Sequence, residues 1–566
     1  MGGTQASEES RIAAALTDPE PAPVSWLLPL AVVVVGMFMA VLDATIVNVA
    51  LPRIQGDLGA DTEDVLWVAT AYTLTLGVVV PLSGWLADRF GLKRVYLTTL
   101  IAFSAGSALC GVAWDLNSLI GFRILQAVPG GLLPVISLTI LNVMVPPEKI
   151  GAAMGLYGLG IVCAPAVGPV LGGWLVDNFH WSLIFYINVP IGLAGAVAAY
   201  FILGNVGTRV RRPFDVIGFA CIGSSLFSLL LACSKGEDWG WTSYPTLALF
   251  TYGVLAMALF VVVELEVTHP LLDVRVFRCW SFSVCMVLLV VVTVGLLGAL
   301  YYLPVFMQLG QGLTALESGM RILPSACVMA VFMPLAGRIY DKLGPRWLAA
   351  VGFTICAVGN YLMHDLTADV THSAIVWWTI VRAIGMGCCT MPVMTTGIAS
   401  VGAARVNAGS AWTMVVRQTS GAIPLAIMSA IATGQQSQLM SDRAAVLTPA
   451  KMAANGVRLP SADPTSIYGV AGVFRQTQVQ VLASSYADVF LITAGLSAVA
   501  ALLALTLPGR PPARVAAAKA AESAPTAPST TTEPPAEPPA VQPPGAAEPA
   551  LEAVPELPVP QPAGSR

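Results

Sequence analysis

Two charged residues stand inside long apolar segments, where charge is unusual. Asp43 lies in the apolar segment 26–50, and Arg123 lies in the segment 117–141. If both segments span a bilayer, a carboxylate there is costly unless it is protonated, paired or hydrated, so Asp43 is a candidate proton-binding group. At 1.5 Å per residue, Asp43 lies about 10 Å and Arg123 about 9 Å from the same membrane surface. Their similar depth predicts a coupled pair. The alternatives are a helix-packing or capping role for Asp43 and, for Arg123, a structural role in which it bonds backbone carbonyls.

A second acidic candidate is Glu317, at the start of the apolar segment 314–336. It is a candidate for proton coupling, but Arg321 lies one turn on, and a plain interfacial ion pair between the two is the favoured interpretation. Three further polar residues inside apolar segments are candidate site residues, namely Gln126, Arg382 and Arg417. The two arginines could face a cavity or satisfy backbone groups. The ten cysteines fall in or beside apolar segments without Cys-x-x-Cys or Cys/His spacing, so no metal site or cofactor is predicted.

The composition explains why charge inside these segments is informative. Apolar residue types make up 56% of the 566 residues and charged types 11%, against about 25% charged in a soluble domain. This argues against a soluble enzyme, a disordered protein and, with a net charge of −4, a nucleic-acid binder. Fourteen segments are long enough to cross a bilayer. They cover residues 26–50, 65–84, 95–114, 117–141, 151–176, 182–204, 214–233, 245–266, 281–306, 314–336, 346–363, 373–395, 407–432 and 486–507.

The basic residues orient these predicted helices. With the N-terminus placed in the cytoplasm, 18 of the 28 Lys and Arg residues fall in cytoplasmic segments and six in outer segments. This bias predicts that both termini are cytoplasmic. The predicted parts are a cytoplasmic N-terminal segment, a six-helix bundle, a linker with two additional helices, a second six-helix bundle containing an extracytoplasmic polar loop, and a disordered Pro/Ala-rich cytoplasmic tail. Their ranges are 1–25, 26–204, 205–280, 281–507 with the loop at 433–485, and 508–566.

An internal repeat links the two predicted bundles. Gly, Asp, base, Gly and base recur at a constant offset of 253 residues, which indicates two parallel repeats, as in secondary transporters. The first copy contains Gly84, Asp88, Arg89, Gly91, Lys93 and Arg94, and the second contains Gly337, Asp341, Lys342, Gly344 and Arg346. We expect Gly84 and Gly91 to allow a tight turn. The acid is expected to bond a helix N-terminus or a base, so that the segment forms a conformational latch.

The fifth apolar segment carries small residues at helical spacing. Ala164, Gly168 and Gly172 stand at i, i+4 and i+8, with Gly173 beside them, and predict close packing of another helix. Pro165 and Pro169 are expected to bend this helix. We interpret it as a pliable seam between the two halves that moves during transport. Ordinary tight packing is the alternative.

Taken together, these motifs resemble the major facilitator superfamily and its fourteen-helix drug:proton antiporter family (EmrB/QacA type). The repeated loop resembles motif A, Arg123 and Gln126 resemble motif B, and Gly168 to Gly173 resemble the end of motif C, the antiporter motif. Further signatures are Leu42–Pro52, Ile187–Gly192 and Arg417-Gln418, whereas Ala127, Ser182 and 421–426 depart from the usual pattern. The resemblance implies an all-α major facilitator fold with two six-helix bundles and two inserted helices. It places Asp43 and Arg123 in one bundle, lining the cavity, and it implies export.

The sequence therefore predicts a multi-pass protein of the bacterial inner membrane that is not an enzyme. It would export amphiphilic small molecules in exchange for protons by alternating access. No Walker A sequence is present, so the proton gradient is the expected energy source. The expected partners are these substrates, protons and the lipid bilayer, without nucleic acid, and the expected state is a monomer. The alternatives are a dedicated exporter of a metabolite, siderophore or lipid, an uptake symporter of the same fold and, remotely, a membrane receptor.

Overall fold

The computed structural model describes residues 26–146, 149–204, 213–268, 270–367, 370–402, 405–446 and 467–509. Within these ranges every regular element is a helix. The predicted N-terminal segment 1–25 lies outside the described residues. So do residues 510–566 of the predicted tail and residues 447–466 of the predicted loop.

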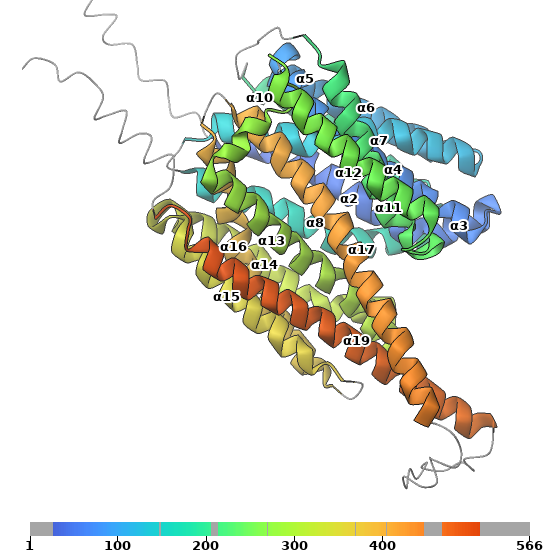
Figure 1. Cartoon of the computed structure of the whole chain (residues 1–566). Coiled ribbons are helices and arrows are strands. Elements are labelled where there is room, and N and C mark those ends of the chain that lie inside the picture. Colours follow the sequence, from blue (N-terminus) through green and yellow to red (C-terminus); the bar gives the residue numbers. More distant parts are fainter. Residues whose placement is uncertain are drawn as a thin grey trace, which may run out of the picture. The chain divides into compact units, whose positions relative to one another are not determined.

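The first group of helices covers the predicted N-terminal bundle (Figure 1). Helix α2 packs against α7, α8 and α10, while α6 packs against α7 and α10. The second apolar segment is bent by 57° between α4 and α5, where Pro81 removes a helical N–H. The elements are α2 (Leu27–Leu58), α3 (Thr62–Val65), α4 (Trp67–Val79), α5 (Leu82–Phe90), α6 (Leu92–Gly111), α7 (Leu116–Met144), α8 (Ile150–Asn178), α9 (Leu183–Tyr186) and α10 (Asn188–Ile202).

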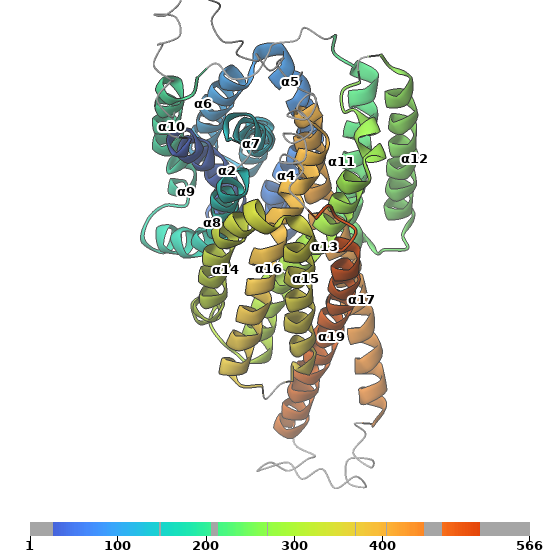
Figure 2. The ribbon, with the colours of Figure 1, turned by 90° about the vertical axis from the view of Figure 1, so that its left-hand side faces the viewer.

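Two additional helices follow, α11 (Val216–Trp239) and α12 (Tyr244–Glu266), and the short 3-10 helix η2 (Val274–Arg278) leads out of them. Helix α11 packs along α12 on one side and contacts both α4 and α17 on the other. Figure 2 shows this pair beside α4 and α17. The inserted pair therefore bridges the two halves of the chain through α11.

The second group of helices begins with α13 (Trp280–Val305), which ends in a π-helical turn, η3 (Phe306–Gly310). The rest of this group is α14 (Ala315–Leu343), α15 (Pro345–Leu362), η4 (Met363–Asp365), α16 (His372–Ser400), α17 (Val406–Val446) and α19 (Ile467–Ala504). The segment 433–485, expected to be a polar loop, is helical over 433–446 and 467–485. In α19 the reason is visible, because Leu482 and Tyr486 pack in an apolar cluster with Tyr302 and Phe306.

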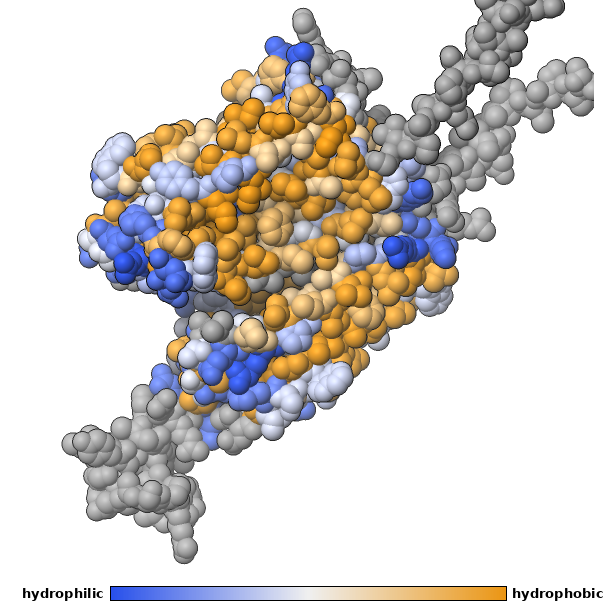
Figure 3. Space-filling view, turned by 180° about the vertical axis from the view of Figure 1, so that it is seen from behind, coloured by the Kyte–Doolittle hydropathy of each residue, from blue (hydrophilic) through white to orange (hydrophobic). Residues whose placement is uncertain are grey.

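Twelve helices in the described ranges are long and apolar enough to cross a membrane, and the bent pair of α4 and α5 gives a thirteenth. The remaining predicted span corresponds to α6, which does not reach that level of apolarity, so the count of fourteen stays a prediction. Large apolar side chains such as Leu255, Val499 and Leu502 point outward. Figure 3 shows one face with a broad hydrophobic surface and hydrophilic residues toward its edges. Such a surface is suited to lipid, and the protein is a multi-pass membrane protein.

Candidate functional site

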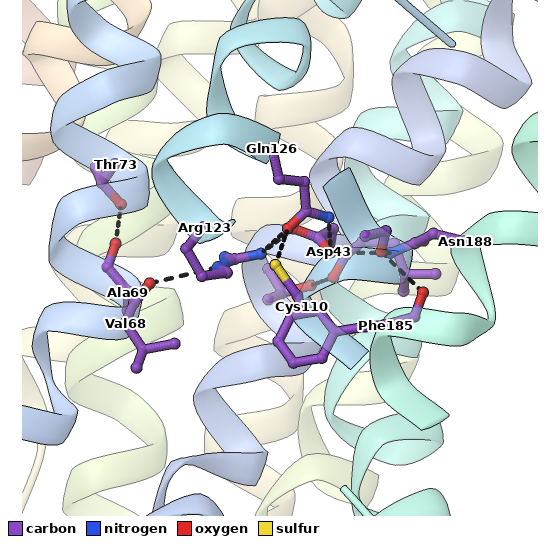
Figure 4. A network of polar contacts seen from close by, with 12 residues as sticks. Asp43, Val68, Ala69, Thr73, Cys110, Arg123, Gln126, Phe185 and Asn188 are labelled. Atoms are coloured by element: carbon purple, nitrogen blue, oxygen red, sulfur yellow. Dashed lines mark hydrogen bonds and ion pairs between the residues drawn. The ribbon is translucent and has the colours of Figure 1, made fainter. Parts of the chain in front are cut away.

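Asp43 is the centre of a buried polar network on the first group of helices (Figure 4). Its side chain is fully buried, and that of Arg123 is 1% exposed. Arg123 Nη1 lies 2.6 Å from Asp43 Oδ2. The other carboxylate oxygen, Oδ1, accepts hydrogen bonds from Gln126 Nε2 at 2.9 Å and Asn188 Nδ2 at 2.8 Å. The structure thus brings Asp43 and Arg123 together at the similar depth that their positions predicted, while their part in proton coupling remains untested.

Arg123 has partners besides Asp43. Its Nη1 also donates to Gln126 Oε1 at 2.8 Å, and its Nε donates to the Val68 carbonyl at 3.4 Å. The guanidinium carbon lies 3.8 Å from the centre of the Tyr72 ring, at cation–π distance. The positive charge therefore keeps a hydrogen-bond acceptor on α7, another on α4 and an aromatic face when the carboxylate changes its charge.

Asn188 and Ser107 complete the network from α10 and α6. Asn188 Nδ2 also lies 3.1 Å from Ser107 Oγ, which donates to the Phe185 carbonyl at 2.8 Å. The sequence contained one signal for Asn188, namely its place in the Ile187–Gly192 signature, but it was not predicted as a site residue. Tyr72 carried no signal at all, because an aromatic residue in an apolar helix is ordinary.

This arrangement allows Asp43 to bind a proton in place of its ion pair with Arg123. A buried ion pair is costly to break when one partner is left bare. Here protonation of Asp43 would leave Arg123 bound to Gln126, Val68 and Tyr72, so the cost is reduced. Because the carboxylate is fully buried, water must reach it through a conformational change before it can gain or lose a proton.

The two motif A aspartates reach across the molecule. Asp341, on α14, accepts the backbone N–H of Gly151 at 3.0 Å and that of Ala152 at 3.3 Å, which belong to the first turn of α8. Asp88, on α5, accepts a hydrogen bond from Asn407 in the first turn of α17. Each half therefore contributes a carboxylate to the beginning of a helix in the other half, where the helix dipole favours negative charge.

The glycines of motif A serve two different purposes. Gly91 and Gly344 end α5 and α14 with φ values of 86° and 81°, which favour glycine. The expectation that Gly84 lies in the turn is wrong, because Gly84 lies within α5. A Cβ there would stand 4.0 Å from the Asn407 carbonyl oxygen of α17. Gly84 thus faces the second half of the chain.

The bases of motif A hold their own half together. The Arg89 guanidinium lies 5.6 Å from the Trp85 ring centre, and Lys93 Nζ donates to the Tyr200 carbonyl at 2.8 Å. Arg94 and Lys342 are exposed. The Arg89 contact thus lies within α5 and the Lys93 bond joins α6 to α10, whereas the aspartates form the cross-half bonds.

Helix α8 uses different glycines for its two neighbours. A Cβ on Gly172 would lie 2.8 Å from Ile46 Cγ1 of α2, and one on Gly168 would overlap Thr45. The contact with α14 in the other half instead involves Gly155, whose Cβ would lie 2.6 Å from Pro334 Cα. The predicted small-residue stripe therefore packs within its own half, and the seam between the halves lies at the other end of α8. Pro165 and Pro169 both lie inside α8. Pro165 stands between Gly155 and Gly168, and Pro169 directly follows Gly168.

Comparison with known proteins places these features in a family. Residues 33–424 match the Major Facilitator Superfamily. The chain belongs to the major facilitator superfamily. Its fold is similar to that of the proton:xylose symporter XylE, with a TM-score of 0.56 and 12% identity, covering 87% of this chain and 98% of that one. The human organic anion transporter MFSD10 gives a TM-score of 0.51 at 12% identity over 83% and 98% of the two chains.

Its sequence relatives in the superfamily include multidrug efflux proteins. The multidrug export protein EmrB of Escherichia coli strain K12 is 30% identical, with 84% of this chain and 93% of EmrB covered. The tetracenomycin C resistance and export protein of Streptomyces glaucescens is 32% identical over 73% of this chain and 77% of its own. The superfamily resemblance and the all-α fold expected from the motifs are confirmed.

In this major facilitator superfamily transporter, Glu317 is not brought to Asp43. Its exposed carboxylate forms a capping box with Thr314 at the start of α14, accepting the Thr314 N–H at 2.9 Å. Arg321 donates to the Glu317 backbone carbonyl at 3.2 Å. Glu317 thus has a structural task, and its part in proton coupling stays a prediction.

The other two intramembrane arginines differ in their exposure. Arg382 is buried in α16, donates to the Gly295 carbonyl of α13 at 3.0 Å and packs closely against Gly359 of α15. It satisfies a backbone group, one of the two alternatives considered for it. Arg417 lies on α17 and is partly exposed.

Proposed function

We propose that this transporter exports amphiphilic small molecules across the bacterial inner membrane in exchange for protons. The observation that carries the proposal is the buried Asp43 carboxylate, held by Arg123, Gln126 and Asn188. Its similarity to EmrB, a multidrug export protein, and to the tetracenomycin C resistance and export protein supports export. The proton gradient would supply the energy, and the protein would work as a monomer.

In the proposed cycle Asp43 binds a proton in the state open to the outside, as substrate leaves. Arg123 then rests on Gln126, Val68 and the Tyr72 ring. In the state open to the cytoplasm, substrate binding favours release of the proton, and the Asp43–Arg123 ion pair forms again. Because substrate occupancy and protonation of Asp43 are coupled in this cycle, each drives the other across the membrane in the opposite direction.

The motif A contacts would act as the latch of this cycle. We place the motif A end, and both termini, in the cytoplasm, as the distribution of basic residues indicates. The bonds from the first turn of α8 to Asp341 of α14, and from Asn407 of α17 to Asp88 of α5, join the two halves at that end. These bonds favour the state closed to the cytoplasm, and opening toward the cytoplasm would break them.

The test uses inverted membrane vesicles that contain the full-length protein. Adding substrates from a panel of dyes should release protons with the wild-type protein, and Asp43→Asn should abolish this release at equal expression. Asp57→Asn is the matched control, because Asp57 also lies on α2 but pairs with Arg53 near the helix end and is partly exposed. Unimpaired proton release by Asp43→Asn would remove Asp43 from the mechanism.

A further inference from the structure

A cavity of about 320 Å³ lies between the two halves of the chain and the inserted helix α11. Its wall includes residues of α4, α11, α13 and α17 and of the turn after α11. Aromatic rings of Trp241 and Tyr301 contribute to it, together with small residues such as Ala69 and Ala426. The cavity is therefore mostly apolar and aromatic, and it is separate from the buried Asp43 network.

One charged side chain lines this cavity among the described residues, namely Glu237 near the end of α11. Its Oε2 accepts a hydrogen bond from Ser429 Oγ of α17 at 2.9 Å, which fixes the carboxylate between the two helices. The nearest base along the helix, Lys235, does not line the cavity. Its Nζ is 2.9 Å from Asp238 Oδ2 and 5.6 Å from the Trp67 ring centre. The cavity consequently has a net negative charge.

A carboxylate beside aromatic rings in an apolar wall matches a lipophilic organic cation. The carboxylate attracts the positive charge, and an aromatic face within about 6 Å adds cation–π attraction. A volume of about 320 Å³ is at the lower end of the range of small-molecule sites. A neutral lipid would gain nothing from Glu237, and an anion would be repelled by it.

Helix α4 is a common wall of this cavity and the Asp43 network. Ala69 and Thr73 line the cavity on one side of the helix, where Thr73 Oγ1 donates to the Ala69 carbonyl at 3.0 Å. Val68 and Tyr72 contact Arg123 on the other side. Figure 4 shows Thr73 and Ala69 on α4 next to the network. A ligand in the cavity would therefore contact α4, the helix that also contacts Arg123.

We propose that this cavity is a binding site for lipophilic organic monocations, in which Glu237 of the inserted helix α11 is the counter-ion. The inference rests on the proposed export function and specifies a substrate class for it. It gives the inserted helix a direct part in substrate selection, and it places a substrate against α4, the helix whose Val68 and Tyr72 contact Arg123.

The test measures equilibrium binding of radiolabelled tetraphenylphosphonium to the purified full-length protein in detergent, with proton release recorded in the same sample. Glu237→Gln should raise the dissociation constant about tenfold, because one close charge partner is lost, and Glu237→Asp should recover most of the affinity. Asp238→Asn is the matched control and should bind as the wild type does. Thr73→Trp should block binding by filling the cavity, whereas Thr251→Trp, on the exposed face of α12, should not.

The outcomes separate this inference from the proposed function. If the wild type does not bind tetraphenylphosphonium, or if Glu237→Gln and Thr73→Trp both bind it within twofold of the wild type, the inference is refuted. If Glu237→Gln loses binding but wild-type binding releases no protons, the cation site stands and proton exchange is refuted. Asp43→Asn should retain cation binding and lose proton release, which would support both.

Discussion

The cross-half bonds of Asp341 allow a quantitative prediction about the conformational equilibrium. Asp341→Asn keeps one acceptor oxygen but loses the second acceptor and the negative charge at the start of α8. The wild-type carboxylate accepts from Gly151 N at 3.0 Å and Ala152 N at 3.3 Å. These are N–H groups of a first helical turn, which have no partner within their own helix. The substitution therefore weakens the state in which the motif A end is closed.

The size of the effect follows from two contributions. A negative charge at a helix N-terminus contributes about 0.3–1 kcal/mol, and up to about 2 kcal/mol where it is partly buried. One lost hydrogen bond contributes about 1 kcal/mol. Together they destabilise the latched state by about 1.3–3 kcal/mol, which is a shift of about 9- to 150-fold in the equilibrium between the two states.

Double electron–electron resonance distances would measure this shift. Nitroxide labels would be attached through an unnatural amino acid, because the chain has ten cysteines. One pair would be placed at Val143 and Leu343, at the motif A end, and the other at Trp174 and Met320, at the opposite end. All four residues are exposed.

In Asp341→Asn the first pair should move apart in a larger fraction of molecules, and the second pair should come closer. Asp57→Asn is the control and should leave both distance distributions unchanged, because Asp57 lies near the end of α2 that is remote from the motif A contacts. If Asp341→Asn gives the wild-type distributions at both ends, the carboxylate does not stabilise this state and the latch interpretation is wrong.

Three further predictions concern the network, the packing of α8 and a helix cap. Asn188→Leu removes a hydrogen bond to a charged group, which contributes about 1.5–3 kcal/mol. The rate of substrate-driven proton release in inverted vesicles should therefore fall at least tenfold. An unchanged rate would exclude a part for Asn188 in proton coupling. Gly172→Leu should lower the thermal unfolding temperature in detergent, since overpacking against α2 costs about 1–3 kcal/mol, whereas Gly173→Leu, whose Cβ would lie 3.9 Å from its neighbour, should change it less. Hydrogen bonds from Ser118 lower the pKa of Asp115, so this cap stabilises the fold above the ordinary carboxyl pKa and loses its effect as pH falls through the lowered pKa. Asp115→Asn should flatten that acid dependence of the unfolding temperature, and an unchanged dependence would contradict this role.

The helices could be predicted because a bilayer imposes a length on each apolar segment. The same regularity gave the depth of Asp43 and of Arg123, so their proximity followed from counting residues. The bounds of α17 and α19 could not be predicted in this way. Their polar ends continue as helices in the segment 433–485, and for α19 this depends on packing against Tyr302 and Phe306.

The roles of the intramembrane arginines could not be read from sequence for a related reason. Arg123 and Arg382 have the same residue type in similar helices, and both are buried. Arg123 meets a carboxylate on α2, whereas Arg382 meets a carbonyl on α13 and a glycine on α15. The partner on another helix decides the role, and helix pairing is not encoded in hydropathy. The same applies to Gly168 and Gly172, which were expected at the seam between halves and instead pack on α2.

The reciprocal aspartate bonds also determine when the molecule becomes complete during its synthesis. Asp88 precedes its partner Asn407 by 319 residues, and Asp341 follows the beginning of α8 by about 190 residues. At about 5–20 residues per second, ribosomes need tens of seconds to make the intervening chain. Throughout that interval the nascent first bundle lies in the membrane without its cross-half bonds. During its synthesis the transporter therefore passes through a period in which the first bundle, without its cross-half bonds, is accessible to insertion factors, proteases and neighbouring chains.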